Sequence, residues 1–347
     1  MTDRDAPHRS GMRVLALVGS AVDEFHADLS RVYAGGFFDA LADEAEYRLR
    51  LAFVTPDGAW RFPESLDTAS IATAQSMSAP DALTRITADG VDLMVPQMFC
   101  RPGMTTYRAA FDLLGIPYVG NTPEVMALAA DKHLSRAVVA SAGVAVPRGE
   151  VLRTAGATTT LQFPVVVKPV DSDNSMGVTL AHDDAALAQA VADALAFSDS
   201  ALVEEYVELG REVRCGIIVR DGELVCLPLE EYAVDADKPI RSSTDKLDRS
   251  DGGDLYLVAK DTTKAWIVDV DDPITDRVWD AARRCHIALG CRHYSLFDFR
   301  IDPDGNPWFL EAGLYCSFSP SSVVAVMAAA AGVPVTDLFA GSVREVM

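Results

Sequence analysis

Residues 294–322 read YSLFDFRIDPDGNPWFLEAGLYCSFSPSS, and this stretch decides how the rest of the chain is interpreted. In its first part polar and apolar residues alternate, so Asp298 falls on the opposite strand face from Phe297. The turn signal DPDGN at 302–306 separates this strand from a second short apolar one. The pattern predicts a β-hairpin with Asp298 on one arm and Glu311 on the other.

A hairpin of this length brings the two carboxylates to the same end of the sheet face. Mg²⁺ binds proteins through one or two carboxylates together with substrate phosphates, so Asp298 and Glu311 are candidate metal ligands. The alternative is that they are solvated acids at strand ends, as most Asp and Glu are. The stretches upstream decide between these two interpretations.

The composition is that of a globular protein with two or three domains. The chain has 347 residues, of which 49% are hydrophobic and 23% charged, enough to bury a sizeable core. Its net charge of −21 disfavours binding to nucleic acid or to an anionic membrane through a general basic surface. An anionic substrate would need local lysines, arginines or metal ions to reverse the field at its site.

The chain shows no signal for export or membrane insertion. Its first residues are polar and charged, and no apolar run approaches the roughly 20 residues of a membrane helix. The six cysteines are scattered, with no C-x-x-C pair, which is typical of reduced thiols. We therefore expect a cytoplasmic protein.

The N-terminal third alternates between strand and helix patterns. Short apolar β-rich runs at 13–19, 49–54, 91–96 and 116–120 predict four strands with helices between them. This alternation indicates a doubly wound α/β domain that extends to about residue 122. No G-x-G-x-x-G follows the first strand, so a nicotinamide dinucleotide site is not expected.

Two lysines follow in contexts that suit anion binding. Residues 124–142 predict a helix that carries Lys132, whose alternative reading is a solvated face. The strand FPVVVKP at 163–169 carries Lys168 near its end, directly before a Ser-, Asp-, Asn- and Gly-rich loop at 170–177. Free backbone N–H groups of such a loop cradle anionic oxygens.

Acidic strands and a basic loop complete the pattern. The strand at 201–207 and the alternating strand at 210–219 carry acids that suit an adenine amino group or ribose hydroxyls, although edge-strand acids are an equal alternative. Residues 232–264 are polar and Lys/Arg-containing, as expected of a lid over phosphates. A helix at 273–290 then leads into the hairpin.

The combined order is DK, VVVKP with its loop, VEEYV, GRE, a basic lid, DFRID, FLEAG and SPSS. It resembles the ATP-grasp superfamily, and within it the D-alanine–D-alanine ligases, over roughly residues 91–340. LLGIPYVG at 113–120 is particularly similar. The resemblance implies an α/β ATP-grasp fold with three domains: an N-terminal doubly wound domain at 1–122, a small central α+β lid domain at 123–207 and a C-terminal α+β domain at 208–347.

The resemblance also implies a nucleotide site, made by Lys132, Lys168, Asn174, Ser175, Glu204, Tyr206, Val207 and Glu212. The two lysines match those that contact the ATP phosphates, and the Asn–Ser pair matches the loop that touches the γ-phosphate. The first glutamate matches the adenine-side acid, followed by the hinge backbone. The second glutamate matches the ribose acid.

The implied chemistry is formation of an acyl phosphate from a carboxylate and ATP, followed by attack of an amine to give an amide. Asp298 and Glu311 match Mg²⁺ ligands, with two ions expected and Mn²⁺ as an alternative metal. Lys246 matches the lid lysine, Ser175 belongs to the catalytic loop, and Ser322 matches the serine that holds the acceptor's carboxylate. Lysines and Mg²⁺ suit phosphoryl transfer because it relies on positioning and charge neutralisation.

Three departures from the ligase pattern bear on substrate choice. Gly313 stands where the ligases have a metal-binding asparagine. Leu296 stands where they have an arginine that stabilises the tetrahedral intermediate, and Arg300 on the same strand face is a candidate substitute. Arg101, in the stretch MFCRPGM, replaces an acidic stretch that holds the donor's amino group, so we expect it to bind an anionic group of the substrate. A solvated loop residue is the equal alternative.

These features predict an ATP-dependent carboxylate–amine ligase for small-molecule amino acids, with γ-glutamyl transfer as one form. D-alanine–D-alanine ligase itself is the first alternative. A non-catalytic nucleotide-binding relative is the second, because an asparagine and an arginine are missing. The sequence leaves open the identity of both amino acids and the oligomeric state, for which a homodimer is one option.

Overall fold

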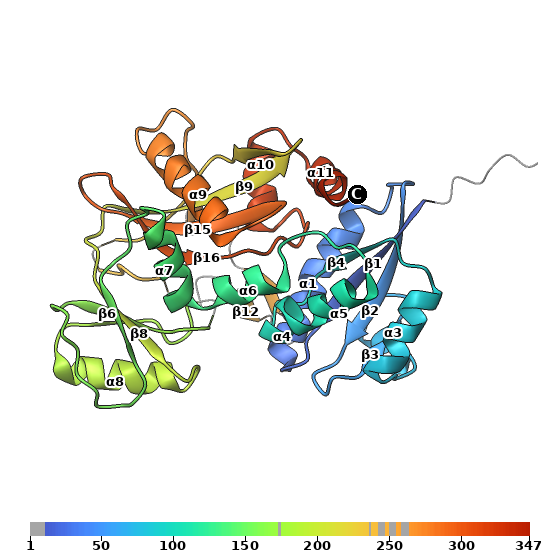
Figure 1. The fold of residues 1–347 in the computed structure, drawn as a ribbon, viewed down its shortest axis with the longest axis horizontal. Helices are drawn as coiled ribbons and strands as arrows, with labels where there is room; N and C mark the ends of the chain where they lie inside the picture. Colours follow the sequence, from blue (N-terminus) through green and yellow to red (C-terminus); the bar gives the residue numbers. More distant parts are fainter. Residues whose placement is uncertain (1–10, 173–174, 236, 242–246, 250–254, 258–263) are drawn as a thin grey trace, which may run out of the picture. The chain divides into compact units, whose positions relative to one another are not determined.

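The computed structural model of the protein describes six ranges of the chain: 11–172, 175–235, 237–241, 247–249, 255–257 and 264–347. One compact unit extends to Val119, and a second runs from Gly120 to Glu345 (Figure 1).

A small sheet forms the centre of the first unit. Its strands are β1 (Met12–Gly19), β2 (Tyr47–Val54), β3 (Trp60–Arg61) and β4 (Leu93–Pro96). The order is β3-β2-β1-β4, with β1, β2 and β4 parallel and β3 antiparallel at the edge. Three predicted strands are confirmed, but the fourth, at 116–120, is wrong. Its main chain makes only an isolated parallel bridge between Tyr118 and Met94.

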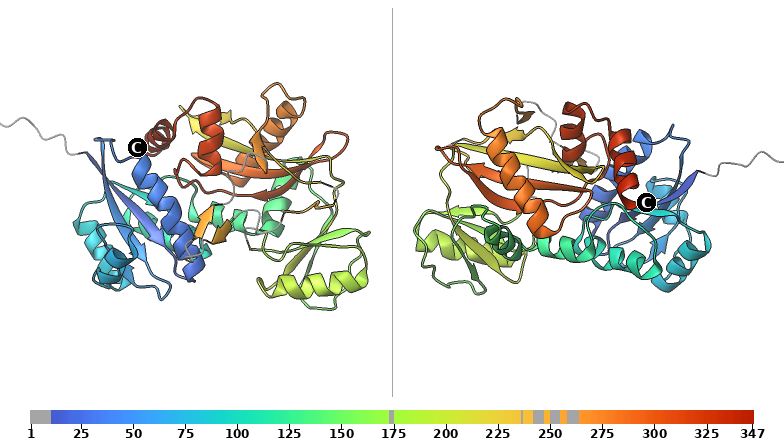
Figure 2. Two further views of the ribbon diagram at one scale, coloured as in Figure 1. Left: turned by 180° about the vertical axis from the view of Figure 1, so that it is seen from behind. Right: turned by 45° about the horizontal axis from the view of Figure 1, so that its top comes forward.

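Helices cover this sheet: α1 (Glu24–Ala40), α2 (Thr68–Thr73), α3 (Ala79–Ala88), α4 (Arg101–Met104) and α5 (Thr106–Leu114). Leu15 and Leu17 of β1 pack with Ile86 of α3 and Phe111 of α5 in one buried cluster. Because side chains alternate along a strand, the neighbouring residues of β1 face the other side of the sheet, and α1 also packs along β1. The doubly wound arrangement predicted for this region is therefore present (Figure 2).

The second unit opens with two helices where one was predicted. α6 (Pro123–Ala130) and α7 (Lys132–Ser141) are separated at Asp131, so the single helix expected at 124–142 is wrong. The Asp131 side chain accepts a hydrogen bond from the Leu134 N–H and caps α7. An aspartate satisfies the free N–H groups of a helix start, which accounts for the break at this residue.

A four-stranded antiparallel sheet follows, with strands β5 (Gly149–Leu152), β6 (Val165–Pro169), β7 (Thr179–Ala181) and β8 (Ala201–Glu205). Its order is β5-β8-β6-β7, and α8 (Asp184–Leu195) packs on it. Valines of β6 and leucines and alanines of α8 form its buried cluster. The apolar run that predicted β6 is therefore the centre of this small layer.

A larger antiparallel sheet contains the hairpin with Asp298 and Glu311. Its strands are β9 (Arg211–Arg220), β10 (Glu223–Cys226), β11 (Glu230–Tyr232), β14 (Ala265–Ile267), β15 (Tyr294–Ile301) and β16 (Pro307–Ala312). Their order is β14-β11-β9-β15-β16, with β10 paired to β9. Within the stretch predicted as a lid, β12 (Leu247–Arg249) and β13 (Leu255–Leu257) pair with each other.

The remaining helices are α9 (Thr275–Leu289), α10 (Val323–Ala330) and α11 (Val335–Val346). In the described ranges no single helix has the length and apolar character of a membrane span. Only α10 and α11 taken together pass that test, and the pair is bent by 107° at the break between them.

The β15 hairpin has the two faces that the alternation predicts. Phe297, Phe299 and Phe309 are fully buried and contact one another edge to face or tilted. Asp298 and Arg300 lie on the other face, which lines a pocket. Burial of three aromatic rings fixes the register of the hairpin, because a one-residue slip would exchange the two faces.

Two buried histidines in this unit give it a pH-dependent stability. Burial lowers the pKa of His286 and of His293 from 6.5 to about 4. Nδ1 of His293 accepts a hydrogen bond of 2.8 Å from the Gly120 N–H, and His286 is 2.8 Å from the Ser295 hydroxyl. Both histidines are therefore neutral in the folded protein above about pH 4.

We predict that the free energy of unfolding falls as the pH drops from 6.5 towards 4. Between these pH values the histidines are protonated in the unfolded chain but neutral in the native protein. Each histidine therefore lowers the free energy of unfolding by about 1.4 kcal/mol per pH unit. Urea unfolding at pH 7 and pH 5 measures the loss. His293→Asn tolerates the positive φ of 61° at this position and lacks the titrating group, so it should lose about 2 kcal/mol less than wild type between those pH values. An equal loss in both proteins would contradict the assignment.

Candidate active site

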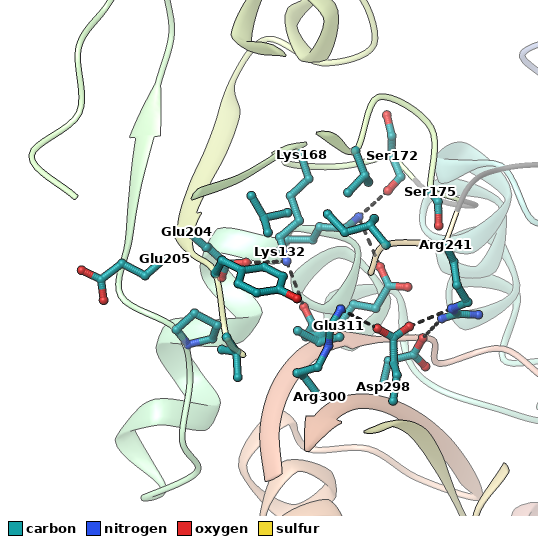
Figure 3. A pocket seen from close by; sticks show the side chains of 18 residues that line it. Lys132, Lys168, Ser172, Ser175, Glu204, Glu205, Arg241, Asp298, Arg300 and Glu311 are labelled. Carbon is teal, nitrogen blue, oxygen red and sulfur yellow. Dashed lines mark hydrogen bonds and ion pairs between the residues drawn. The ribbon is translucent and has the colours of Figure 1, made fainter. Parts of the chain in front are cut away.

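A pocket between the four-stranded sheet and the larger sheet of the second unit is lined by most of the residues that the sequence singled out (Figure 3). Those that line it are Lys132, Lys168, Ser175, Glu204, Tyr206, Val207, Glu212, Asp298, Arg300 and Glu311. Ile240 and Arg241, from the predicted lid, line it as well. Segments that are far apart in the sequence therefore meet at one place.

The two lysines are buried and paired. Lys132 begins α7, its Nζ donates to the Ser172 carbonyl oxygen, and it lies 3.7 Å from the Glu311 carboxylate. Lys168 lies near the end of β6, and its Nζ is 2.5 Å from Glu204. Lysines with exposures of 6% and 7% are rare unless they have partners. The solvated-face alternative for Lys132 is therefore wrong.

The loop after β6 approaches the same space. Ser175 has a positive φ of 59° and lines the pocket. At Gly177 a Cβ atom would lie 2.9 Å from the Pro169 ring and 2.9 Å from Phe197, so only glycine fits there. The loop is thus held close against the end of β6, beside Lys168.

Glu204 carries a second cation that the sequence reasoning missed. Arg136 Nε lies 3.0 Å from Glu204 Oε1, so this buried acid sits between Arg136 and Lys168. Arg136 lies four residues after Lys132 on α7, and residues at that spacing share a helix face. The spacing of four residues from Lys132 could therefore have indicated Arg136 as a further site residue.

Glu212 is surrounded by arginines. Its two carboxylate oxygens accept from Arg241 at 2.8 Å and from Arg300 at 2.9 Å. Burial by itself would raise the pKa of Glu212, but the charges of these two guanidinium groups hold the pKa below its ordinary value. Arg300 is 6% exposed, and its Nε and Nη1 have no hydrogen-bond partner among the described residues.

The hairpin places its two acids directly opposite each other. Asp298 pairs with Glu311 in the β15–β16 register, as the sequence predicted. Asp298 also pairs across the sheet with Arg214 of β9, whose Nε lies 2.9 Å from Oδ1. Arg241 Nη2 lies 3.0 Å from Oδ2. Arg214 was missed, although its spacing of two from Glu212 puts both on one strand face.

Two predicted residues that the structure describes are not among those that line the pocket, and two more lie outside the described ranges. Ser322 is the N-cap residue of α10 and is buried, with its Oγ 4.0 Å from the Cys316 sulfur. Arg101 is the exposed first residue of α4, in the first unit. Asn174 and Lys246 lie outside the described residues. Their roles stay predictions.

Comparison with known proteins identifies the family. The family model described as "D-ala D-ala ligase C-terminus" matches residues 142–343, more than half of the chain. A D-alanine–D-alanine ligase of Nocardia farcinica is 30% identical over 93% of each chain. This chain belongs to the D-alanine–D-alanine ligase family.

Solved structures show the same fold over nearly the whole chain. The D-Ala:D-Ser ligase VanG of Enterococcus faecalis is 21% identical, with a TM-score of 0.77 over 96% of this chain and 99% of that one. A Bacillus anthracis D-alanine–D-alanine ligase complexed with ATP is 19% identical, with a TM-score of 0.70 over 96% and 97%. The protein is therefore an ATP-grasp amino-acid ligase, and ligases of this family use ATP and Mg²⁺.

The pocket of this family member offers Mg²⁺ few ligands of its own. In the part of the chain that the structure describes, no three His, Cys, Asp or Glu side chains converge to hold a metal ion. Glu311 lines the pocket, whereas both oxygens of Asp298 contact guanidinium groups, and Gly313 has no side chain. Such a set fits an ion that takes most of its ligands from phosphates and water, as Mg²⁺ commonly does.

We predict that Lys168→Met weakens ATP binding about tenfold to a hundredfold, because one charge-assisted hydrogen bond to phosphate contributes about 1.5–3 kcal/mol. Isothermal titration calorimetry with a non-hydrolysable ATP analogue measures the dissociation constant. Arg148→Met is the matched control. Arg148 is exposed and does not line the pocket, and its side chain lies 3.5 Å from that of Glu205. Equal affinity in wild type and Lys168→Met would remove Lys168 from the nucleotide site.

Proposed function

We propose that this ligase joins two amino acids through an acyl phosphate, and that at least one of them is not D-alanine. The observation that carries the proposal is the pocket in which Lys132, Lys168, Arg241 and Arg300 face one another between two sheets of a chain with net charge −21. Four cations at one pocket, each able to donate charge-assisted hydrogen bonds, suit a polyanion such as ATP. Residues 123–207 and 208–347 would then act as the two ATP-grasp domains.

In the first step a carboxylate oxygen of the donor attacks the γ-phosphorus, and the bond from that phosphorus to ADP breaks. In the second step the acceptor's amine attacks the acyl carbon, the bond to phosphate breaks, and the amine loses a proton. Lys132 and Lys168 would hold the phosphate oxygens, Glu204 and the backbone of Tyr206 and Val207 the adenine, and Glu212 the ribose. Mg²⁺, when bound, would neutralise phosphate charge, and Glu311 would hold it together with phosphate oxygens and water.

The departures from the ligase pattern support a substrate other than D-alanine. Arg101 offers a planar cation where an ammonium group would be repelled, which suits a donor with an additional carboxylate. Ser322 would hold the acceptor's carboxylate. D-alanine–D-alanine ligation is the second candidate, supported by the family relatives. A homodimer and a cytoplasmic location stay predictions.

Mass spectrometry of products tests this function. The protein is incubated with ATP, Mg²⁺ and pools of amino acids, and we expect an amide product together with ADP and phosphate. A product made only from D-alanine would favour the second candidate. Absence of any amino-acid-dependent phosphate release would contradict both.

We predict that Glu311→Gln raises the Mg²⁺ concentration needed for half-maximal rate about tenfold or more, because an amide oxygen replaces a charged ligand. Titration of Mg²⁺ against initial rate measures it. Glu205→Gln is the control, since Glu205 also lines the pocket but pairs with exposed Arg148. If both variants follow the wild-type curve, Glu311 is not a metal ligand.

We predict that Arg101→Ala raises the donor's KM selectively, by about tenfold, because one charged hydrogen-bonding partner is lost. A donor screen on wild type should show preference for dicarboxylic amino acids. The acceptor's KM is the internal control and should not change. Preference for monocarboxylic donors together with an unchanged donor KM would refute the role of Arg101.

A further inference from the structure

A single guanidinium group bridges the two acids at the centre of the pocket. Nε of Arg241 donates to Glu212 at 2.8 Å, and Nη2 donates to Asp298 at 3.0 Å. Figure 3 shows Arg241 beside Asp298. The guanidinium group lies over the Tyr232 ring, 3.6 Å from its centroid, and the side chain is 11% exposed. Arg241 is therefore fixed by two ion pairs and a cation–π contact.

The other carboxylate oxygens of the two acids are also occupied. Arg214 Nε lies 2.9 Å from Asp298 Oδ1, from the directly opposite position on β9. Arg300 Nη2 donates to Glu212 Oε2 at 2.9 Å. Three guanidinium groups thus neutralise two carboxylates, and no negative charge in this group remains unmatched.

A divalent ion that bound directly to Asp298 would have to displace Arg241. It would also approach Arg214, which cannot lose its proton in the physiological range. Displacement would leave a buried guanidinium group with one ion pair broken, which is strongly unfavourable in a low-dielectric site. The position beside Asp298 is filled by a permanent cation of protein origin.

We propose that Arg241 takes the place of a metal ion at Asp298, so that the enzyme binds one divalent ion with its nucleotide, on the Glu311 side of the hairpin. The inference rests on the proposed function, since it assumes that the pocket binds ATP. It replaces the expectation of two ions. Arg241 is then a fixed positive charge beside the phosphates, and its planar fork also suits phosphate oxygens.

The experiment counts Mn²⁺ ions. Electron paramagnetic resonance of free Mn²⁺ gives the number bound per chain in the presence of the β,γ-imido analogue of ATP. Wild type should bind one ion. Arg241→Met should bind two, because Oδ2 of Asp298 loses its guanidinium partner while Arg214 stays on Oδ1.

Arg211→Met is the matched control. Arg211 also bridges two acids, Glu231 at 2.5 Å and Asp272 at 2.9 Å, but it lies outside the pocket lining. Its loss should leave the count at one. If circular dichroism shows that Arg241→Met is unfolded, Arg241→Gln provides the same test.

The outcomes separate the two proposals. Two ions in wild type overturn this inference and leave the ligase function standing. One ion in the folded Arg241 variant overturns the substitution of metal by arginine. No nucleotide-dependent ion in wild type overturns this inference and counts against the proposed function as well.

Discussion

The pairing of buried charges is the constraint on which the site depends. Lys132, Lys168, Glu204, Glu212 and Asp298 are all less than 9% exposed, and isolated charges at such positions would not be tolerated. Each acid is matched by at least one cation from another strand, helix or loop, and Lys132 of α7 lies 3.7 Å from Glu311 of the hairpin. The fold and the charge pattern are therefore specified together.

This interleaving lets an acidic protein bind an anionic nucleotide. A chain with net charge −21 repels ATP at long range, so the cations that line the pocket are the groups able to attract its phosphates at short range, through charge-assisted hydrogen bonds. Lysines supply compact charges on α7 and β6, whereas arginines of β9, β15 and the loop after β11 supply planar ones. The sheet that contains β9 and β15 presents acids and arginines on one face, namely Glu212, Arg214, Asp298 and Arg300.

Much of the hairpin could be predicted from the sequence, because the alternation of polar and apolar residues and the turn signals are local features. The hairpin, its two faces and the opposition of Asp298 to Glu311 follow from residues within one short stretch. The break between α6 and α7 was missed because an N-capping aspartate in mid-pattern looks like any helix residue. The strand expected at 116–120 does not form, because the few backbone hydrogen bonds that this segment makes depend on where its neighbour β4 ends. Which acid each arginine contacts depends on the sheet register, which the sequence does not reveal. The sequence therefore predicted that Arg241 belongs to a lid, but not that it contacts Glu212 and Asp298.

We propose that a carboxylate of one amino acid is activated by ATP in this pocket. The most direct measurement uses the donor found in the product screen, labelled with ¹⁸O in both carboxylate oxygens, and determines the mass of the phosphate released. The account predicts one ¹⁸O atom in each phosphate, because the donor's oxygen attacks the γ-phosphorus and stays with phosphate when the amide forms. Amide product accompanied by unlabelled phosphate would contradict it.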